Sequence, residues 1–312
     1  DKGKVGMLLR AFLSALLVLL ATAALIALLL KAVSGDGWYV CILNALPFAV
    51  ISSSIAIPSV ANMRKVDREF VIYESSLSDI IGIVVFDFVL FNDTVTSKSL
   101  LVLGADMGAI ALISVVFCLG LLWLMGKLKH HIKFFLIMSV LVMVYALAKQ
   151  FHLSSLIIVL AFGLLLNNAD RLHNPLFARV FHYPRMGTDL DQMKTLTAES
   201  AFLIRTFFFL LFGFSIDLVE LGRLPVLALG AFMIAAIYFA RIAVMAVVAR
   251  KERPYVQLIA PRGLISILLF FSIPAAHAHE LVGNAVLFMV IIVTSLLMSY
   301  GLIRAGKEAP EG

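Results

Sequence analysis

Charge and cysteine are scarce in this chain of 312 residues. Charged residues make up 14% of it, whereas soluble proteins average about 25%, and 62% of the residues are hydrophobic. The two cysteines, Cys41 and Cys118, both lie in apolar stretches, so we interpret them as small buried side chains. They provide neither a disulfide framework nor a metal-ligand cluster. This composition excludes an ordinary soluble domain and indicates a protein that crosses a membrane several times.

Sequence motifs of several enzyme classes are also missing. The sequence contains no glycine-rich phosphate loop, no nucleophile elbow and no HExxH zinc motif. ATP-driven transport and hydrolysis therefore have no support, and we expect neither an enzyme nor a bound cofactor. The histidine pairs at 130–131 and at 277 and 279 lack the further ligands of a metal site, and we interpret them as loop residues.

Long apolar runs predict an all-α membrane protein with about ten spans. A helix of about 20 apolar residues crosses the hydrocarbon core of a bilayer. The fifth and sixth spans are short, so they are long enough only if they are little tilted or partly broken. The predicted ranges are 7–31, 38–62, 69–91, 99–125, 134–149, 153–168, 196–218, 224–249, 255–276 and 281–305.

Positive charge is distributed unevenly over the predicted loops. Eighteen of the 25 Lys and Arg residues lie in the two terminal segments and in the loops after even-numbered spans. Four lie in the opposite loops and three inside spans. Because basic loops stay in the cytoplasm, both termini are predicted to be cytoplasmic. The net charge of +6 therefore reflects topology and gives no evidence of nucleic-acid binding.

An acidic residue lies near the middle of the third predicted span. Asp79 occurs within FVIYESSLSDIIGIVVFDFVLF, residues 70–91. A carboxylate at this depth costs about 2.5–3.5 kcal/mol on insertion scales, and such groups usually line an ion or proton path. The alternative is a structural carboxylate that pairs with an arginine. Glu74 lies about 140° from Asp79 around the helix, so the two do not form a facing pair. Glu74 and Asp87 are expected to be structural or interfacial.

Two further spans carry signals of interruption. The second ends in LPFAVISSSIAIPSVANMR, where three serines precede Pro58. Proline removes a backbone donor, and serine hydroxyls can satisfy freed backbone groups or coordinate a cation. The ninth contains Pro261, Arg262 and Gly263. Spans one to three and eight to ten run in opposite directions with a broken middle member in each trio, which predicts an inverted repeat with a midplane site.

Arginines inside the spans are expected to balance the carboxylates. Arg205 lies in the seventh span and cannot easily lose its proton, so it needs a partner. Arg262 either reaches the membrane interface or neutralises carbonyl ends and carboxylates near the site. Arg241 is interpreted as a structural or lipid-interface arginine. The candidate partners of Arg205 are Glu74, Asp79 and Glu199.

Four segments together resemble the monovalent cation:proton antiporter superfamily. YESSLSDIIGIVVF is similar to the Glu-Ser…Asp signature of that family, and ISSSIAIPSV to its preceding discontinuous helix. ESAFLIRTFFFLLFGFSID and APRGLISILL resemble its late basic helix and second crossover helix. The resemblance covers essentially the whole chain and implies two inverted repeats within twelve or thirteen spans. We therefore expect about three N-terminal spans of the family to be missing from this sequence.

By this resemblance, Asp79 alternately binds a proton and a monovalent cation, Na⁺ or K⁺. Ser78 stands where many members have Asn or Asp, and residues 54–56 lack the acid of the Thr-Asp-Pro motif. A single carboxylate favours one-for-one, electroneutral exchange. The predicted binding residues are Asp79, Ser78, Ser54, Ser53 and Ser52, and the predicted supporting residues are Arg205, Arg262, Glu74, Glu199 and Pro58.

The chain is expected to be one exchanger domain that forms a homodimer in the lipid bilayer of the bacterial inner membrane. Its expected parts are an incomplete first repeat (1–125), a connecting region (126–195), a second repeat (196–305) and a cytoplasmic tail (306–312). Two other functions stay open: a potassium efflux or channel-like system on the same fold, and a non-transporting membrane sensor or assembly subunit. In the latter, Asp79 and Arg205 would form a structural pair.

Overall fold

The computed structural model describes residues 2–92, 133–150, 186–250 and 254–308, together with Glu252 and short pieces between residues 104 and 163. Every regular element in these parts is a helix. The chain divides into two compact units, the first formed by residues 1–93 and 209–312 and the second by residues 94–208. Most of the predicted site residues belong to the first unit.

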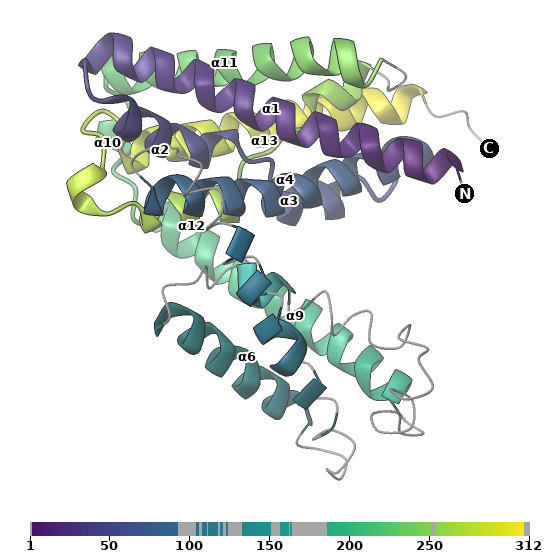
Figure 1. Ribbon diagram of the computed structural model, residues 1–312. Helices are drawn as coiled ribbons and strands as arrows, with labels where there is room; N and C mark the ends of the chain where they lie inside the picture. Colours follow the sequence, from purple (N-terminus) through teal and green to yellow (C-terminus); the bar gives the residue numbers. More distant parts are fainter. Residues whose placement is uncertain are drawn as a thin grey trace. The chain divides into compact units, whose positions relative to one another are not determined.

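The N-terminal part of the chain supplies one trio of helices to the first unit. α1 (Lys2–Ser34) is 33 residues long, about 50 Å at 1.5 Å per residue, so it exceeds the hydrocarbon thickness of about 30 Å. α2 (Trp38–Ala49) and α3 (Ser53–Ser59) are the halves of a broken helix, and α4 (Lys65–Phe91) completes the trio. α1 packs against both α2 and α4 (Figure 1).

The C-terminal part supplies a second trio with the same plan. Its middle member is broken into a 3₁₀ helix and an α-helix, and α11 packs against both α13 and α1 of the first trio (Figure 1). The short helices α10 and η3 precede the first and the last member. The elements are α10 (Leu218–Leu221), α11 (Leu224–Val248), η2 (Pro254–Leu258), α12 (Leu264–Ser272), η3 (Ala275–His277) and α13 (Asn284–Glu308).

The two trios run in opposite directions. Arg10, near the start of α1, pairs with Glu252 just after the end of α11, with 2.8 Å between Nη1 and Oε1. Leu29, near the end of α1, lines a groove together with Leu229 near the start of α11. α1 and α11 are therefore antiparallel. The inverted repeat predicted from the sequence is confirmed as an arrangement of helices.

The start of α1 and the end of α13 lie at one end of the first unit, which we call the terminal end (Figure 1). Met7 of α1 shares a buried cluster there with Met298 and Ala305 of α13. Burial raises the pKa of Glu252 at this end, and the neighbouring Arg10 counteracts that shift. We call the other end the opposite end. The cytoplasmic location of the termini stays a prediction.

The two broken helices cross at their irregular segments. The first break covers residues 50–52 and precedes Pro58, which lies inside α3. The second break covers residues 259–263 and contains the predicted Pro-Arg-Gly sequence. The amide of Ser52 donates a hydrogen bond to the carbonyl of Pro261 at 2.8 Å. A Cβ on Gly263 would lie 2.7 Å from Ser52 Oγ, so only glycine allows this close crossing.

Eight of the ten predicted spans coincide with helices or broken helices of the structure, and the described residues of the other two are also helical. The structure describes 14 of the 27 residues in the range 99–125, and residues 157–161 and 163 of the range 153–168. Apart from the elements above, the counterparts are α6 (Lys133–Gln150) and α9 (Met186–Phe214). α9 begins ten residues before the predicted range 196–218 because hydropathy marks the apolar part of a helix and not its polar extension. Five helices in the described parts are long and apolar enough to cross a membrane.

Close contact between α4 and the first break makes Gly82 a test of this packing. A Cβ atom on Gly82 would overlap the side chain of Val50, whereas one on Gly6 of α1 would meet nothing within 4 Å. Overpacking typically costs about 1–3 kcal/mol. We expect Gly82→Val to lower the thermal unfolding midpoint of the purified protein in detergent, and Gly6→Val to leave it nearly unchanged. Equal midpoints for the two variants would contradict the close contact.

Candidate functional site

Asp79 extends from α4 to the start of α3. Its Oδ2 atom accepts a hydrogen bond from the amide of Ser53 at 3.2 Å and a second from the Ser53 hydroxyl. The other carboxylate oxygen, Oδ1, is buried and has no hydrogen-bond partner within the described parts of the chain. The broken helix thus holds one oxygen of the carboxylate, and the other is chemically able to take a proton or a cation.

Ser78 and Gly82 hold the first break against α4. The Ser78 hydroxyl accepts a hydrogen bond from the amide of Ile51 at 2.9 Å. Gly82 lies four residues further along, hence on the same helix face, and allows Val50 to approach the backbone. Serine hydroxyls in a broken helix can coordinate a cation or satisfy freed backbone groups, and the predicted cation-binding role of Ser78 stays a prediction. The observed bond is of the second kind, because the hydroxyl replaces a missing backbone acceptor.

The remaining serines of the break lie on either side of Ser53. Ser52 is buried, and its hydroxyl lies 2.9 Å from that of Ser54. The Ser52 amide is used in the crossing with Pro261. Pro58 is exposed near the end of α3. Three hydroxyls are therefore gathered at the start of α3, where Asp79 meets it, and Pro58 lies one turn beyond them.

Arg262 is wholly buried and binds the ends of both broken helices. Its guanidinium donates to the carbonyls of Phe48 at 2.8 Å, Ala260 at 2.7 Å and Ala49 at 3.4 Å. Its amide donates to the Thr294 hydroxyl of α13 at 3.1 Å. Phe48 and Ala49 end α2, and the carbonyl end of a helix carries partial negative charge. The geometry matches the expectation that Arg262 neutralises carbonyl ends.

Glu74 forms a buried ion pair that the sequence analysis missed. Its carboxylate meets the guanidinium of Arg241 on α11 at two points, with Nη2–Oε2 3.0 Å and Nη1–Oε1 3.1 Å. Ser14 of α1 donates to Glu74 at 2.6 Å. The structural role expected for Arg241 fits, and the lipid-interface role does not, since this residue is wholly buried. Arg241 also donates to the carbonyls of Val256, Gln257 and Ile259.

The sequence did contain a signal for this pair, because Glu74 and Arg241 each lie inside an apolar span, where a charged side chain needs a partner of opposite charge. From the sequence, Glu74 was instead one of three candidate partners of Arg205. Arg205 and Glu199 lie on the part of α9 that belongs to the second unit. Their charge-balancing role beside Asp79 stays a prediction.

A second polar cluster that the sequence did not reveal lies at the opposite end. The side chain of Asn44 donates to the His277 carbonyl at 2.8 Å and accepts from the His279 amide at 3.1 Å. His279 Nε2 lies 3.0 Å from the Ser34 hydroxyl and 3.3 Å from Asp36 Oδ2. This cluster joins the loop after α1 to the loop before α13. Within the described residues, no group of three or more His, Cys, Asp or Glu side chains is placed to hold a metal.

Two broken helices that cross beside a buried carboxylate have the architecture of a secondary transporter. A family model described as "Sodium/hydrogen exchanger, transmembrane" matches residues 5–304. The chain therefore belongs to the sodium/hydrogen exchanger family, and cation/proton antiport is its class of function. The family resemblance and the all-α antiporter fold are confirmed, as are its character as a transporter and its place in a membrane.

Solved structures include a similar fold. One is the sodium proton antiporter MjNhaP1 from Methanocaldococcus jannaschii at pH 8, with a TM-score of 0.64 and 18% sequence identity. The similarity covers 98% of this chain and 77% of that one. A comparison with curated protein sequences finds no match.

The Glu74–Arg241 pair makes a thermodynamic prediction. Removing one partner of a buried ion pair leaves an uncompensated charge and costs about 3–5 kcal/mol, whereas replacing both partners by apolar groups is often close to neutral. We expect Arg241→Met to lower the thermal unfolding midpoint strongly. The double variant Glu74→Leu/Arg241→Met should recover the part of the loss that comes from the uncompensated Glu74 charge, but not the part that comes from the three carbonyls bound by Arg241. Arg304→Met, at an exposed position of α13, is the control. A loss for Arg241→Met no larger than that of the control would contradict the pair.

Proposed function

We propose that this protein exchanges a monovalent cation, Na⁺ or K⁺, for H⁺ by means of one carboxylate, that of Asp79. The observation that carries the proposal is that the two oxygens of this carboxylate have different surroundings. Oδ2 is bound by the amide and hydroxyl of Ser53, while Oδ1 is buried without a hydrogen-bond donor in the described parts. A buried carboxylate oxygen in this condition is stabilised by any proton or cation that reaches it.

Coupling follows from competition for this oxygen. An ionised carboxylate without a partner is unfavourable at membrane depth, whereas its protonated and cation-bound forms are better tolerated. The site therefore switches its access from one side of the membrane to the other when Asp79 is protonated or cation-bound. Because a proton and a cation cannot occupy the same carboxylate together, each displaces the other. The outcome is one-for-one exchange without net charge movement.

Among the described residues, two buried charged groups near Asp79 already have partners, which supports Asp79 as the site of exchange. The carboxylate of Glu74 is bound by Arg241 and Ser14. Arg262 is bound to three backbone carbonyls. The hydroxyls of Ser52, Ser53 and Ser54 are the proposed additional oxygen ligands of the cation, since alkali cations are coordinated by oxygen.

Replacing Asp79 tests the proposal directly. In proteoliposomes that contain the full-length protein and an internal pH dye, we expect added Na⁺ or K⁺ to drive proton flux. Asp79→Asn keeps the shape of the side chain and removes its charge, so we expect flux to fall at least 100-fold. Asp87→Asn, two turns further along α4, is the matched control and should keep most of the activity. Full exchange by Asp79→Asn would refute the proposal.

The same assay separates the open alternatives. Proton flux that requires the cation on the opposite side indicates exchange, whereas cation flux without proton movement indicates a channel-like system. Absence of both fluxes in the wild type favours a sensor or assembly subunit. Parallel measurements with Na⁺ and K⁺ decide the cation.

Competition also predicts a specific pH dependence. At pH values below the pKa of the transporting carboxylate, protons occupy most sites. The apparent KM for the cation should then rise about tenfold for each pH unit of acidification, as mass action requires. The maximal rate at saturating cation should change less. Initial rates measured over a matrix of pH and cation concentration check this, and an apparent KM that is independent of pH would exclude competition at one carboxylate.

A further inference from the structure

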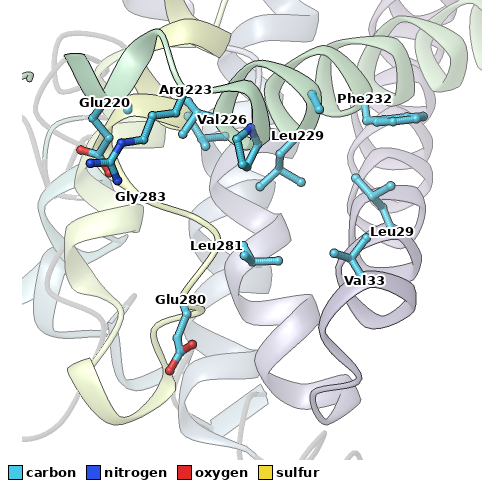
Figure 2. Close-up of a pocket in the computed structure, with 14 residues that line it drawn as sticks. Leu29, Val33, Glu220, Arg223, Val226, Leu229, Phe232, Glu280, Leu281 and Gly283 are labelled. Atoms are coloured by element: carbon cyan, nitrogen blue, oxygen red, sulfur yellow. The ribbon is translucent and has the colours of Figure 1, made fainter. Parts of the chain in front are cut away.

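A groove of about 530 Å³ opens at the opposite end of the first unit. It lies between the end of α1, the start of α11 and the start of α13, and none of the proposed ion-binding residues lines it (Figure 2). Its walls are apolar, with Leu29 and Val33 facing Leu229 and Phe232 (Figure 2). Val33 and Phe232 are 62% and 61% exposed. The groove therefore presents apolar surface that needs an apolar occupant.

Charged side chains lie at the mouth of this groove. Glu220 of α10 and Arg223, just before α11, extend toward each other on one side, and Glu280 lies apart from them in the loop before α13 (Figure 2). The Glu220 carboxylate is directed toward the start of α13, because a Cβ on Gly283 would lie 3.8 Å from its Oε1. The mouth thus offers one cationic group and two anionic groups above an apolar cavity.

The position of this mouth along the helices corresponds to the membrane surface. At the same end of α1, the Lys31 ammonium lies 5.2 Å from the centre of the Trp38 ring, which is half-exposed. Tryptophan and lysine at a helix end are typical of the headgroup level of a bilayer. Leu29 and Val33 of the groove lie on either side of Lys31 along α1, so the groove begins at this level.

We propose that this groove binds a glycerophospholipid whose headgroup carries both a phosphate and a primary ammonium. One acyl chain would occupy the apolar cavity, the phosphate would bind the Arg223 guanidinium, and the ammonium would bind the carboxylate of Glu220, which extends toward Arg223. Guanidinium groups form strong charge-assisted hydrogen bonds with phosphate. A headgroup with phosphate alone would meet two carboxylates against one guanidinium, so charge complementarity selects the zwitterionic lipid.

The lipid preference is measurable by native mass spectrometry of the full-length protein in detergent. The protein is mixed with equal amounts of phosphatidylethanolamine, phosphatidylcholine and phosphatidylglycerol. We expect phosphatidylethanolamine adducts to survive best, since its ammonium has N–H donors, and phosphatidylglycerol adducts to be fewest. Equal retention of all three lipids would overturn the proposed headgroup recognition.

Separate variants test the phosphate contact, the ammonium contact and the apolar cavity of the site. Arg223→Gln should reduce the adducts of all three lipids about tenfold, the effect of one lost charge-assisted hydrogen bond. Glu220→Gln should abolish the preference for phosphatidylethanolamine while leaving lipid binding, and Glu280→Gln, at the carboxylate that lies apart, should keep that preference. Ala228→Phe places a ring in the groove, and Ala231→Phe, an exposed position of the same helix outside the groove, is its matched control.

Loss of adducts with Ala228→Phe but not with Ala231→Phe supports the groove as the site. Equal adduct levels in these two variants would overturn the proposal. So would a change in the dimer fraction with Ala228→Phe at unchanged lipid binding, because a second copy of the chain would then be the occupant. Circular dichroism of each variant verifies that a loss of adducts does not result from unfolding.

Discussion

Broken helices can exist inside a membrane only where side chains or other backbone segments replace the lost hydrogen bonds, since the hydrocarbon offers none. In this protein the amide of Ile51 is bound by Ser78, and the amide of Ser52 by the carbonyl of Pro261. The carbonyls at the end of α2 are bound by Arg262. The two breaks thus satisfy each other, and the rest of the first unit positions the groups that make this possible.

The buried charged side chains of this arrangement differ in how completely they are hydrogen-bonded. Arg262 and the Glu74–Arg241 pair make several hydrogen bonds each, so they act as fixed parts of the framework. Asp79 is held at one oxygen by Ser53 and keeps the other buried without a donor in the described parts. Among the buried charged groups that the structure describes in the first unit, Asp79 has a carboxylate oxygen without a donor, and this condition supports the proposal that a proton or a cation binds there.

Local signals predicted much of this arrangement. Pro261, Arg262 and Gly263 marked the second break at the correct residues, and the apolar runs marked most of the described helices. The partners of the charged residues could not be predicted in the same way. Arg241 lies 167 positions from Glu74 in the chain, and nothing local to either residue indicates the other. The polar cluster of Asn44 and His279 was missed for the same reason.

The sequence by itself indicated the membrane class, the family, the two interrupted helices and an acid inside the third span. The family was indicated by the resemblance of four segments. The other features depend on hydropathy, on proline and glycine, and on the cost of a buried charge, and each acts over one helix at most. The tertiary structure decided that Ser53 meets Asp79, that Ser78 supports the break, and that Arg241 neutralises Glu74. Those contacts depend on how antiparallel trios cross, and the crossing is a property of the whole unit.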